Sequence, residues 1–258
     1  MSLDLFARPA LLFLPASNPR AIAKARESAA DLVILDLEDA VKESDKQSAR
    51  AAAVEAVSVA WPMPVAIRIN GIGTAWHDAD LAAGLGSACD LIIVPMVERP
   101  LAITGKPVAA MIETAAGVLA APAIARSVCA LIVGTNDLSN SLRLPSIDRA
   151  AMNTALQSAV LAARAAGIAV FDGVYNRLDD PDGLAAECTA GRALGFDGKS
   201  LIHPDQIGPC QAAFAPTAAE IARAERLVAA ATGGAERFEG AMIEDMHVET
   251  ARRLLARR

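Results

Sequence analysis

Short apolar segments alternate with longer amphipathic segments along most of the chain. Eight apolar segments have the length and composition of buried strands, at residues 10–14, 32–37, 65–69, 91–94, 107–112, 130–133, 169–174 and 199–202. A helical spacing of apolar residues is clearest over 148–166, where Met152, Leu156, Ala159 and Ala163 share one face and Gly167 follows as a stop. This regular alternation predicts parallel βα units.

Eight parallel strands with intervening helices predict an α/β fold of the TIM (β/α)8 barrel type, because closure removes the exposed edges of the sheet. An open, doubly wound sheet is the structural alternative, but no GxGxxG motif follows any predicted strand. Only about ten residues separate the fourth and fifth strands, which is short for a crossover helix. We therefore expect the fourth helix to be abbreviated.

The chain continues beyond the eight predicted units, so we divide it into a catalytic barrel domain, 8–214, and a C-terminal helical extension, 215–258. The extension should contain helices at 216–231 and 242–258, joined by the hinge TGGAERFEG, which is rich in glycine and charge. Val248, Ala251 and Leu255 lie on one face of the second helix. That apolar stripe must pack either on its own barrel or on a neighbouring subunit.

Composition restricts the function classes. The 258 residues carry a net charge of -6 and only 3% aromatic residues, so no basic or stacking surface indicates a nucleic-acid partner. No apolar run reaches the ~18 residues of a membrane span, and LLFLP near the start lacks the flanks of a signal peptide. Four cysteines without metal-ligand spacing indicate buried thiols in a reducing cytoplasm, which is the expected location.

Polar residues gather where the predicted strands end, the edge at which such folds carry their chemistry. Glu113 ends the fifth strand and Asp137 follows the sixth in GTNDL. Because adjacent strands lie ~4.8 Å apart, these two acids can share one cation. Other side chains expected at this edge are Asp36, Glu38, Asp39, Arg68, Asn70, Asp172 and His203.

An edge with so many carboxylates repels itself unless a metal ion neutralises it. Donors that are all oxygen, without a Cys/His cluster, favour Mg²⁺, with Mn²⁺ as the alternative. Glu113 and Asp137 are the predicted ligands, and Glu38 and Asp39 would hold bound waters as a second shell. The planar guanidinium of Arg68 suits a substrate carboxylate.

Each of these residues also has an interpretation that is purely structural. Glu113 and the DLED acids could simply favour helix N-termini, and Arg68 could form a salt bridge to those acids. His203 could bond substrate or be a structural histidine. The other two histidines, His77 and His247, are interpreted as surface residues.

Eight segments in the same order resemble the citrate lyase beta subunit and malyl-CoA lyase family, within the wider HpcH/HpaI aldolase superfamily. They are ALLFLPASNPRAIAKA, DLVILDLEDAV, VAIRINGIGT, LIIVPMVE, MIETAAGV, GTNDL, GFDGKSLIHPDQI and GAMIEDMHVETARRLL. The resemblance extends from Arg8 to the C-terminus. Each motif alone is weakly specific, but eight in register are specific.

The resemblance implies a magnesium-dependent lyase on a TIM barrel. Such enzymes cleave or form the C–C bond of a 3-hydroxyacyl thioester of the citryl, malyl or citramalyl type, which yields an acyl thioester and a 2-oxo acid. The family's metal ligands fall on Glu113 and Asp137, and its substrate-carboxylate partner falls on Arg68. Its tail aspartate, which enters a neighbouring subunit's site in a homotrimer, falls on Glu244, with Asp245 adjacent.

We therefore expect catalytic roles for Arg68, Glu113, Glu244 and Asp245, and substrate contacts that also include Asn70, His203 and Pro204. The coenzyme A (CoA) part of a thioester would lie near Arg20 and Lys24, whose alternative is a solvated helix face. Met96 stands where many citrate lyase relatives have lysine.

The sequence leaves the exact reaction open. Alternatives are a metal-dependent pyruvate aldolase acting on free hydroxy-oxo acids, an acyl-CoA thioesterase, and a beta subunit that depends on citrate lyase alpha and gamma subunits. The acyl group and the thioester carrier, CoA or a protein-bound group, are also undetermined.

Overall fold

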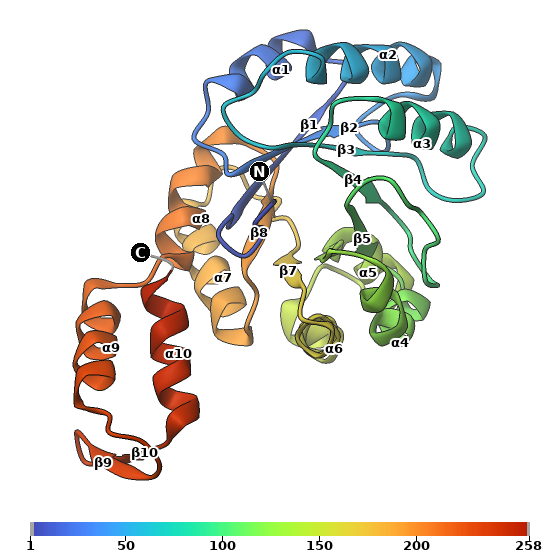
Figure 1. Ribbon diagram of the computed structural model, residues 1–258. Helices are drawn as coiled ribbons and strands as arrows, with labels where there is room; N and C mark the ends of the chain where they lie inside the picture. The colour runs from blue at the N-terminus through green and yellow to red at the C-terminus, as the bar shows by residue number, and fades with distance from the viewer. Residues whose placement is uncertain (1–2, 257–258) are drawn as a thin grey trace. The chain divides into compact units, whose positions relative to one another are not determined.

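A computed structural model describes residues 3–256. Eight parallel strands close into a barrel in chain order (Figure 1). Their bounds are β1 Ala10–Pro15, β2 Leu32–Asp36, β3 Val65–Arg68, β4 Leu91–Val94, β5 Val108–Ile112, β6 Ala130–Val133, β7 Ala169–Asp172 and β8 Gly198–Leu201. β8 pairs with β1, where Leu11 stands opposite Ser200. The predicted barrel is confirmed, and the open sheet is wrong.

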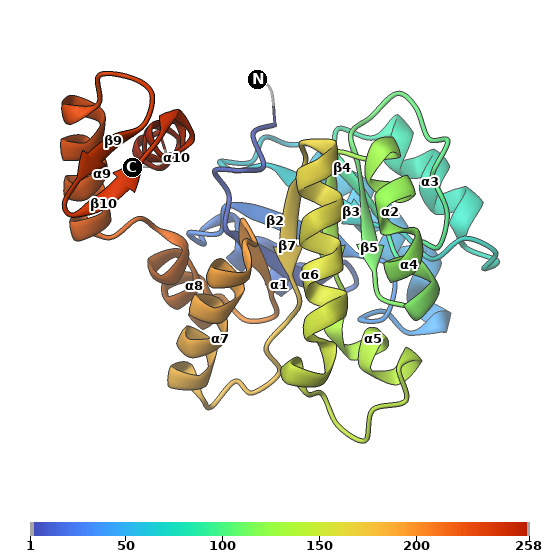
Figure 2. The same ribbon diagram turned by 90° about the horizontal axis from the view of Figure 1, so that it is seen from below.

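Helices follow most strands and cover the outside of the barrel (Figures 1 and 2). They are α1 Pro19–Arg26, α2 Lys46–Val57, α3 His77–Gly86, α4 Ala115–Ile124, α5 Thr135–Ser141, α6 Arg149–Ala166, α7 Pro181–Leu194 and α8 Ile207–Phe214. Between β4 and β5, the described chain forms a loop without a helix, because the connection is too short for one. We expected a short helix in this connection, and none is present in the described chain.

Local signals in the sequence set the helix ends. Asn18 caps α1 by accepting a hydrogen bond from the Ala21 amide at 3.1 Å, and a proline takes the first helical position. Asp148 caps α6 through the amide of Ala150 at 2.8 Å. Gly167 ends α6 with a φ of 70°, a left-handed conformation that glycine adopts without steric cost.

Alternation along the strands decides which strand-end residues point into the barrel. Leu32 and Ile34 of β2 belong to the interior core, as do Ala66 of β3 and Met111 of β5. The same parity continues to Asp36, Arg68 and Glu113, so these three charged side chains point inward at the carboxyl ends of their strands. In β7 the core residue is Phe171, which directs Asp172 to the helix layer.

The described chain divides into two compact units between Ala213 and Phe214. We call the second the tail unit. It contains helices α9 Ala218–Ala230 and α10 Asp245–Leu255, which lie side by side, and a hairpin of β9 Glu236–Phe238 and β10 Ala241–Ile243 (Figure 1).

Three predictions about the tail are corrected. The hinge TGGAERFEG is a hairpin, because Gly233, Gly234 and Gly240 adopt positive φ in the turns around two short paired strands. Residues 241–243 form its second strand, so α10 begins later than predicted. The apolar stripe of α10 packs on α9 within the tail unit, a third arrangement beside the two expected. The shared core is made by Ala224, Leu227, Ile243, Val248 and Ala251.

Among residues 3–256, no helix combines the length and apolar character that crossing a membrane requires.

Candidate active site

A cavity of about 390 Å³ opens at the carboxyl ends of the barrel strands. Its charged lining residues are Asp36, Asp39, Arg68, Glu113 and Asp137. Apolar side chains from the same edge, among them Phe13, Met111, Val133, Val174 and Ile202, complete the walls. The cavity therefore joins a cluster of carboxylates to an apolar surface, at the edge where barrel enzymes bind substrates.

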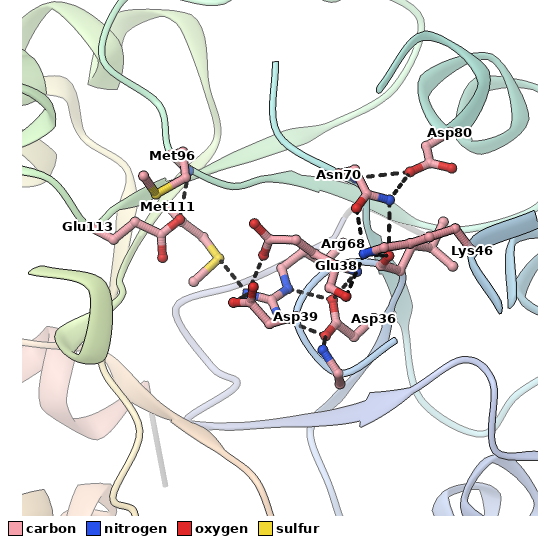
Figure 3. Close-up of polar contacts among 12 residues, drawn as sticks. Asp36, Glu38, Asp39, Lys46, Arg68, Asn70, Asp80, Met96, Met111 and Glu113 are labelled. Carbon is pink, nitrogen blue, oxygen red and sulfur yellow. Dashed lines mark hydrogen bonds and ion pairs between the residues drawn. The ribbon is translucent and has the colours of Figure 1, made fainter. Parts of the chain in front are cut away.

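Among the carboxylates of the cavity for which the described residues show no ion pair, Glu113 is the most buried. Its side chain is 2% exposed, and Oε1 accepts a hydrogen bond from the Met96 amide at 2.6 Å (Figure 3). Oε2 is buried and has no hydrogen-bond partner among the described residues. Burial raises the pKa of Glu113 to about 7, although the Met96 amide and Arg68 lower it.

Two backbone features position Glu113. Met96 adopts a φ of 53°, which is uncommon for a residue with a side chain, and this conformation presents its amide to the carboxylate. Gly134, at the end of β6, passes so close that a Cβ there would collide with the Glu113 side chain. The short connections after β4 and β6 thus leave space for one orientation of this acid.

Asp137 lies in the first turn of α5, which begins directly after β6. Gly134 leads straight from the strand into this helix, without an intervening loop. Asp137 lines the cavity with Glu113, and burial followed by the charge of Asp39 raises its pKa. The structure therefore brings the two predicted metal ligands to one cavity.

Arg68 forms a buried ion-pair cluster on the opposite wall (Figure 3). Nε and Nη2 donate to the two carboxylate oxygens of Asp36 at 2.6 and 2.7 Å. Nη1 lies 2.8 Å from Glu38 Oε2 and 3.7 Å from Asp39 Oδ2. Burial opposes the charge, but the pair with Asp36 raises the pKa of Arg68 above its ordinary value. The salt-bridge alternative is thus observed, and the guanidinium still lines the cavity.

The DLED turn after β2 is held from two sides. Asp36 accepts hydrogen bonds from the amides of Glu38 at 2.9 Å and Ala40 at 3.0 Å. The ammonium of Lys46 donates to the carbonyl oxygens of Leu37 at 2.8 Å and Glu38 at 2.7 Å.

The two acids of the turn differ in burial. Burial raises the pKa of Glu38 to about 8, although Arg68 lowers it. Asp39 is 68% exposed at the cavity mouth.

Asn70 was predicted to contact substrate, and the structure assigns it a different place. Its side chain is 3% exposed, accepts from Lys46 at 2.7 Å and donates to Asp80 at 2.5 Å (Figure 3). It does not line the cavity, because this network turns it toward α2 and α3. His77 is also corrected: it is buried, with Nδ1 2.9 Å from the Asn70 carbonyl oxygen.

His203 and Pro204 are likewise absent from the cavity lining, which on this strand includes Ile202. His203 caps a short 3₁₀ turn and accepts a hydrogen bond from the Asp205 amide at 3.2 Å, which occupies its Nδ1. Asp172 lies outside the cavity as well. It forms a buried ion cluster with Lys199 at 3.1 Å and Arg149 at 3.0 Å.

The remaining predicted residues are exposed. Arg20 and Lys24 lie one turn apart on the exposed face of α1. Glu244 and Asp245 stand at the start of α10 in the tail unit, where Asp245 Oδ1 accepts from the Gly234 amide at 3.2 Å. Their roles in binding CoA and in proton transfer stay predictions.

Sequence reasoning missed three features that build the site: Lys46 behind the turn, the Met96 amide and Gly134. Asp36 was expected at this edge, and a salt bridge from Arg68 to the DLED acids was one of the two interpretations of Arg68. Asp36 follows Leu32 and Ile34 at the inward spacing of the strand. Lys46 gave no signal, because a lysine at the start of a helix is ordinarily solvated.

The residues present fit a hard divalent cation. Glu113 Oε2 is an orphaned buried acceptor, and Asp137 supplies a second carboxylate in the same cavity. Across the described residues there is no group of three or more His, Cys, Asp or Glu side chains suited to a metal. Mg²⁺ does not need one, since it takes one or two carboxylates and completes its shell with water and substrate oxygens.

A closed parallel barrel with carboxylates and one arginine lining a cavity at its carboxyl edge has the architecture of the TIM-barrel enzymes, which carry their sites at this edge. The family model described as HpcH/HpaI aldolase/citrate lyase matches residues 9–106 and 101–204, and the chain belongs to this family.

The alignments with known relatives cover most or nearly all of this chain. A (3S)-malyl-CoA thioesterase of Cereibacter sphaeroides is 40% identical over 96% of this chain and 93% of its own. CitE from Mycobacterium tuberculosis, solved with magnesium, acetoacetate and coenzyme A, is 34% identical with a TM-score of 0.88, over 98% of this chain and 99% of that one. A citrate lyase beta subunit from M. tuberculosis, solved with oxaloacetate and magnesium, has a TM-score of 0.76 and 34% identity, over 83% and 100%.

Proposed function

We propose that this protein is a Mg²⁺-dependent carbon–carbon lyase acting on a 3-hydroxyacyl thioester, with an acyl thioester and a 2-oxo acid as products. The observation that carries the proposal is the placement of Glu113 and Asp137 in one cavity beside Arg68. Family membership supports it, and CitE of M. tuberculosis was solved with both magnesium and coenzyme A.

The cleavage requires a defined movement of protons and electrons. The substrate hydroxyl loses a proton and becomes the carbonyl of the 2-oxo acid, while the electron pair of the broken C–C bond passes to the α-carbon of the thioester. That carbon then takes up a proton. A cation held by Glu113 and Asp137 would supply Lewis-acid polarisation of the substrate oxygens.

The protein's own residues orient the substrate. Arg68, fixed by Asp36 on the cavity wall, would direct its remaining N–H toward the substrate carboxylate. Glu38 and Asp39 would hold water beside the two ligands and keep the acidic cluster ordered. The apolar walls exclude bulk water, which strengthens each of these interactions.

The acid that protonates the α-carbon would come from the tail unit. Glu244 and Asp245 are exposed at the start of α10, and we propose that one of them enters the cavity of a neighbouring subunit in a homotrimer. Asp245 is shorter than Glu244, so the two differ by about one C–C bond in reach, and displacements of ~1 Å matter in catalysis.

Thioester hydrolysis is the second candidate, and one observation favours it: the 40% identical relative is a (3S)-malyl-CoA thioesterase. The two reactions differ in products. Hydrolysis gives free CoA and a 3-hydroxy acid, whereas the lyase gives an acyl-CoA and a 2-oxo acid. A pyruvate aldolase acting on free hydroxy-oxo acids would release a 2-oxo acid without any thioester.

Binding of the thioester and of other subunits is also part of the proposal. Arg20 and Lys24 on the exposed face of α1 would meet the phosphates of CoA. Dependence on citrate lyase alpha and gamma subunits is the alternative to independent activity. The four free cysteines suit the reducing cytoplasm, which stays our expectation for the location.

The proposal is tested by incubating the purified protein with citryl-CoA, malyl-CoA or citramalyl-CoA and Mg²⁺, followed by chromatography of the CoA products and an enzymatic assay of 2-oxo acids. We expect an acyl-CoA and a 2-oxo acid in equal amounts, and loss of both with EDTA. Free CoA without acyl-CoA would identify the thioesterase instead.

A Glu113→Ala variant tests the role of the site itself. It should keep the circular dichroism spectrum of the native barrel and lose Mg²⁺ binding and turnover, because one of the two ligands is gone. Full activity of Glu113→Ala in EDTA would contradict the proposal. An exposed carboxylate variant, Glu55→Gln, should retain both properties.

A further inference from the structure

The loop between β4 and β5 contains a residue in a costly conformation that its own side chain does not explain. Met96 has a φ of 53°, which is unfavourable for a residue with a Cβ. Its side chain is 46% exposed, so packing of that side chain does not select the conformation. What the conformation supplies is a backbone contact, in which the Met96 amide donates to Glu113 Oε1 at 2.6 Å (Figure 3).

A conformation of this kind persists only where its surroundings hold it. Directly after Met96, the amide of Val97 donates to the carbonyl oxygen of Met111 in β5 at 3.2 Å, and Val97 is 1% exposed. The carbonyl oxygen of Val97 faces the first turn of α4, where a Cβ on Gly117 would lie 2.7 Å from it. Val97 is thus fixed between the strand that leads to Glu113 and the helix that follows.

Glu98 adds a second contact to the same helix. Its Oε1 accepts a hydrogen bond from the hydroxyl of Thr114 at 2.8 Å, and the oxygen of that hydroxyl accepts from the Gly117 amide at 2.9 Å. Thr114 follows Glu113 directly and caps α4. Glu98 does not line the cavity, yet it contacts the residue next to the carboxylate that does.

These contacts give the two oxygens of Glu113 different roles. The Met96 amide occupies Oε1 and leaves Oε2 buried and without a partner among the described residues. A carboxylate fixed in this way loses less conformational freedom on binding a cation than one that rotates freely. The orientation of Glu113 therefore depends on the left-handed backbone of Met96.

We propose that the loop of residues 95–98 holds Glu113 in its cation-binding orientation, with Met96 acting through its backbone amide and Glu98 as a positioning residue that acts through Thr114. The inference deepens the proposed function and rests on it for the identity of the ion. A loop that contributes no ligand would thereby set the affinity of the site.

Two substitutions of Met96 separate its backbone from its side chain. Met96→Gly keeps a backbone that adopts positive φ without steric cost, whereas the β-branched side chain of Met96→Val disfavours this conformation. Isothermal titration calorimetry with MgCl₂ at about pH 8.5, above the pKa of about 7 of Glu113, measures the affinity. We expect Met96→Gly to stay close to the native affinity and Met96→Val to bind Mg²⁺ about tenfold more weakly. Equal affinities of the two variants would overturn the role of the backbone.

Glu98 is tested in the same titration. Glu98→Ala removes the acceptor of the Thr114 hydroxyl and should weaken Mg²⁺ binding about threefold, since one partly exposed hydrogen bond contributes modestly. Glu98→Gln keeps an accepting oxygen and should restore the affinity, although the charge is gone. Glu55→Ala, which removes an exposed carboxylate from α2, is the control and should bind Mg²⁺ as the native protein does.

Native affinity in Glu98→Ala would overturn the role of Glu98, and so would a loss in Glu98→Gln as large as that in Glu98→Ala. Thermal unfolding in EDTA distinguishes positioning from a general loss of stability. A purely structural role would lower the unfolding temperature of Met96→Val and leave its Mg²⁺ affinity native, which would overturn the proposal. If Met96→Val does not fold, the two Glu98 variants decide.

Mg²⁺ binding is measured without turnover, so the outcomes distinguish this inference from the proposed function. The expected order of affinities without C–C cleavage would contradict the lyase and leave the inference standing. Cleavage by the native protein, with equal Mg²⁺ affinity in every variant, would overturn the inference and leave the lyase standing. Failure of the native protein to bind Mg²⁺ would overturn both.

Discussion

At the scale of single residues, burial gives the carboxylates of the cavity different properties. Asp36 is fully paired with Arg68, whereas Glu113 has one satisfied oxygen and one without a partner. Burial raises the pKa of Glu113 to about 7, because the loss of water disfavours its charged form more than the Met96 amide and Arg68 favour it. A divalent cation is the ligand that would remove this penalty.

Replacement of Gly134 by alanine should displace Glu113. A Cβ at Gly134 would overlap the carboxylate, whereas the φ of −95° at this residue suits alanine, so the effect is steric. We expect Mg²⁺ affinity to fall about tenfold or more, given the sensitivity of sites to ~1 Å shifts. Calorimetric titration with Mg²⁺ measures it.

Gly86→Ala is the matched control, because nothing lies within 4 Å of a Cβ there. It should bind Mg²⁺ as the native protein does. Native affinity in Gly134→Ala would show that Glu113 can move without cost and is not held by this contact.

The pH dependence of metal binding follows from Glu113. Its pKa in the folded protein is about 7, above the ordinary 4.5, so below pH 7 a proton competes with Mg²⁺ for the carboxylate. Apparent affinity should rise up to about tenfold per pH unit toward pH 7 and then level. Mg²⁺ titrations between pH 5.5 and 8.5 measure this, and an affinity independent of pH would contradict it.

Metal-free stability should change in the opposite direction. The folded protein keeps a proton on Glu113 between its ordinary pKa of 4.5 and about 7, whereas the unfolded chain has released it. The free energy of unfolding in EDTA should therefore decrease as pH rises through this window, by at most about 1.4 kcal/mol per unit. Urea unfolding at several pH values measures it, and a Glu113→Gln variant should show a weaker dependence.

At the scale of elements, connections position the side chains of the site. The turn between β2 and α2 is held by Asp36 from the barrel side and by Lys46 from the helix side. Lys46 is 9% exposed, and its ammonium reaches Leu37 O, Glu38 O and Asn70 Oδ1 at 2.7 to 2.8 Å. This clamp fixes Glu38 against Arg68 (Figure 3).

Lys46→Met should loosen the turn. Removal of the ammonium leaves Asn70 Oδ1 without its donor and takes one of two donors from the carbonyl oxygens of Leu37 and Glu38, which costs about 1–3 kcal/mol of unfolding free energy. Urea unfolding measures the loss, and a raised KM for the thioester would show that Glu38 and Arg68 have shifted. Lys42→Met, an exposed lysine in the same connection, should stay within about 0.5 kcal/mol of the native protein.

At the scale of the whole molecule, the barrel and the tail unit each have their own core. The barrel carries the cavity, and the tail unit carries Glu244 and Asp245 on its surface. The proposed catalysis therefore needs groups from two units, and a homotrimer would bring the tail of one subunit to the cavity of another.

Subunit mixing tests this arrangement. A Glu113→Gln variant and a double variant with Glu244→Gln and Asp245→Asn should each lose most turnover. Mixing them under conditions that exchange subunits should restore activity, because some hetero-oligomers combine an intact cavity with an intact tail. Turnover measured before and after mixing gives the answer, and no recovery despite proven exchange would place tail and cavity in the same chain.

The sequence by itself determined the order of strands, the closed barrel and the residues at its carboxyl edge. Local rules suffice for these: apolar segments of strand length mark the strands, Asn18, Asp148 and Gly167 mark helix ends, and strand-end acids must meet at one edge. The pairing of Glu113 with Asp137 in one cavity followed from this topology.

Tertiary structure alone decided which polar residues line the cavity and which form contacts outside it. Asn70 turned into a network with Lys46 and Asp80, His203 capped a turn, and the tail helix packed on α9. The Asn70 network and the packing of the tail helix depend on partners distant in sequence, which leave no periodic trace in the chain, whereas the His203 cap is a local contact with the Asp205 amide. The sequence left Arg68 open between a substrate carboxylate and a salt bridge to the DLED acids, and the folded protein shows the contacts with Asp36 and Glu38.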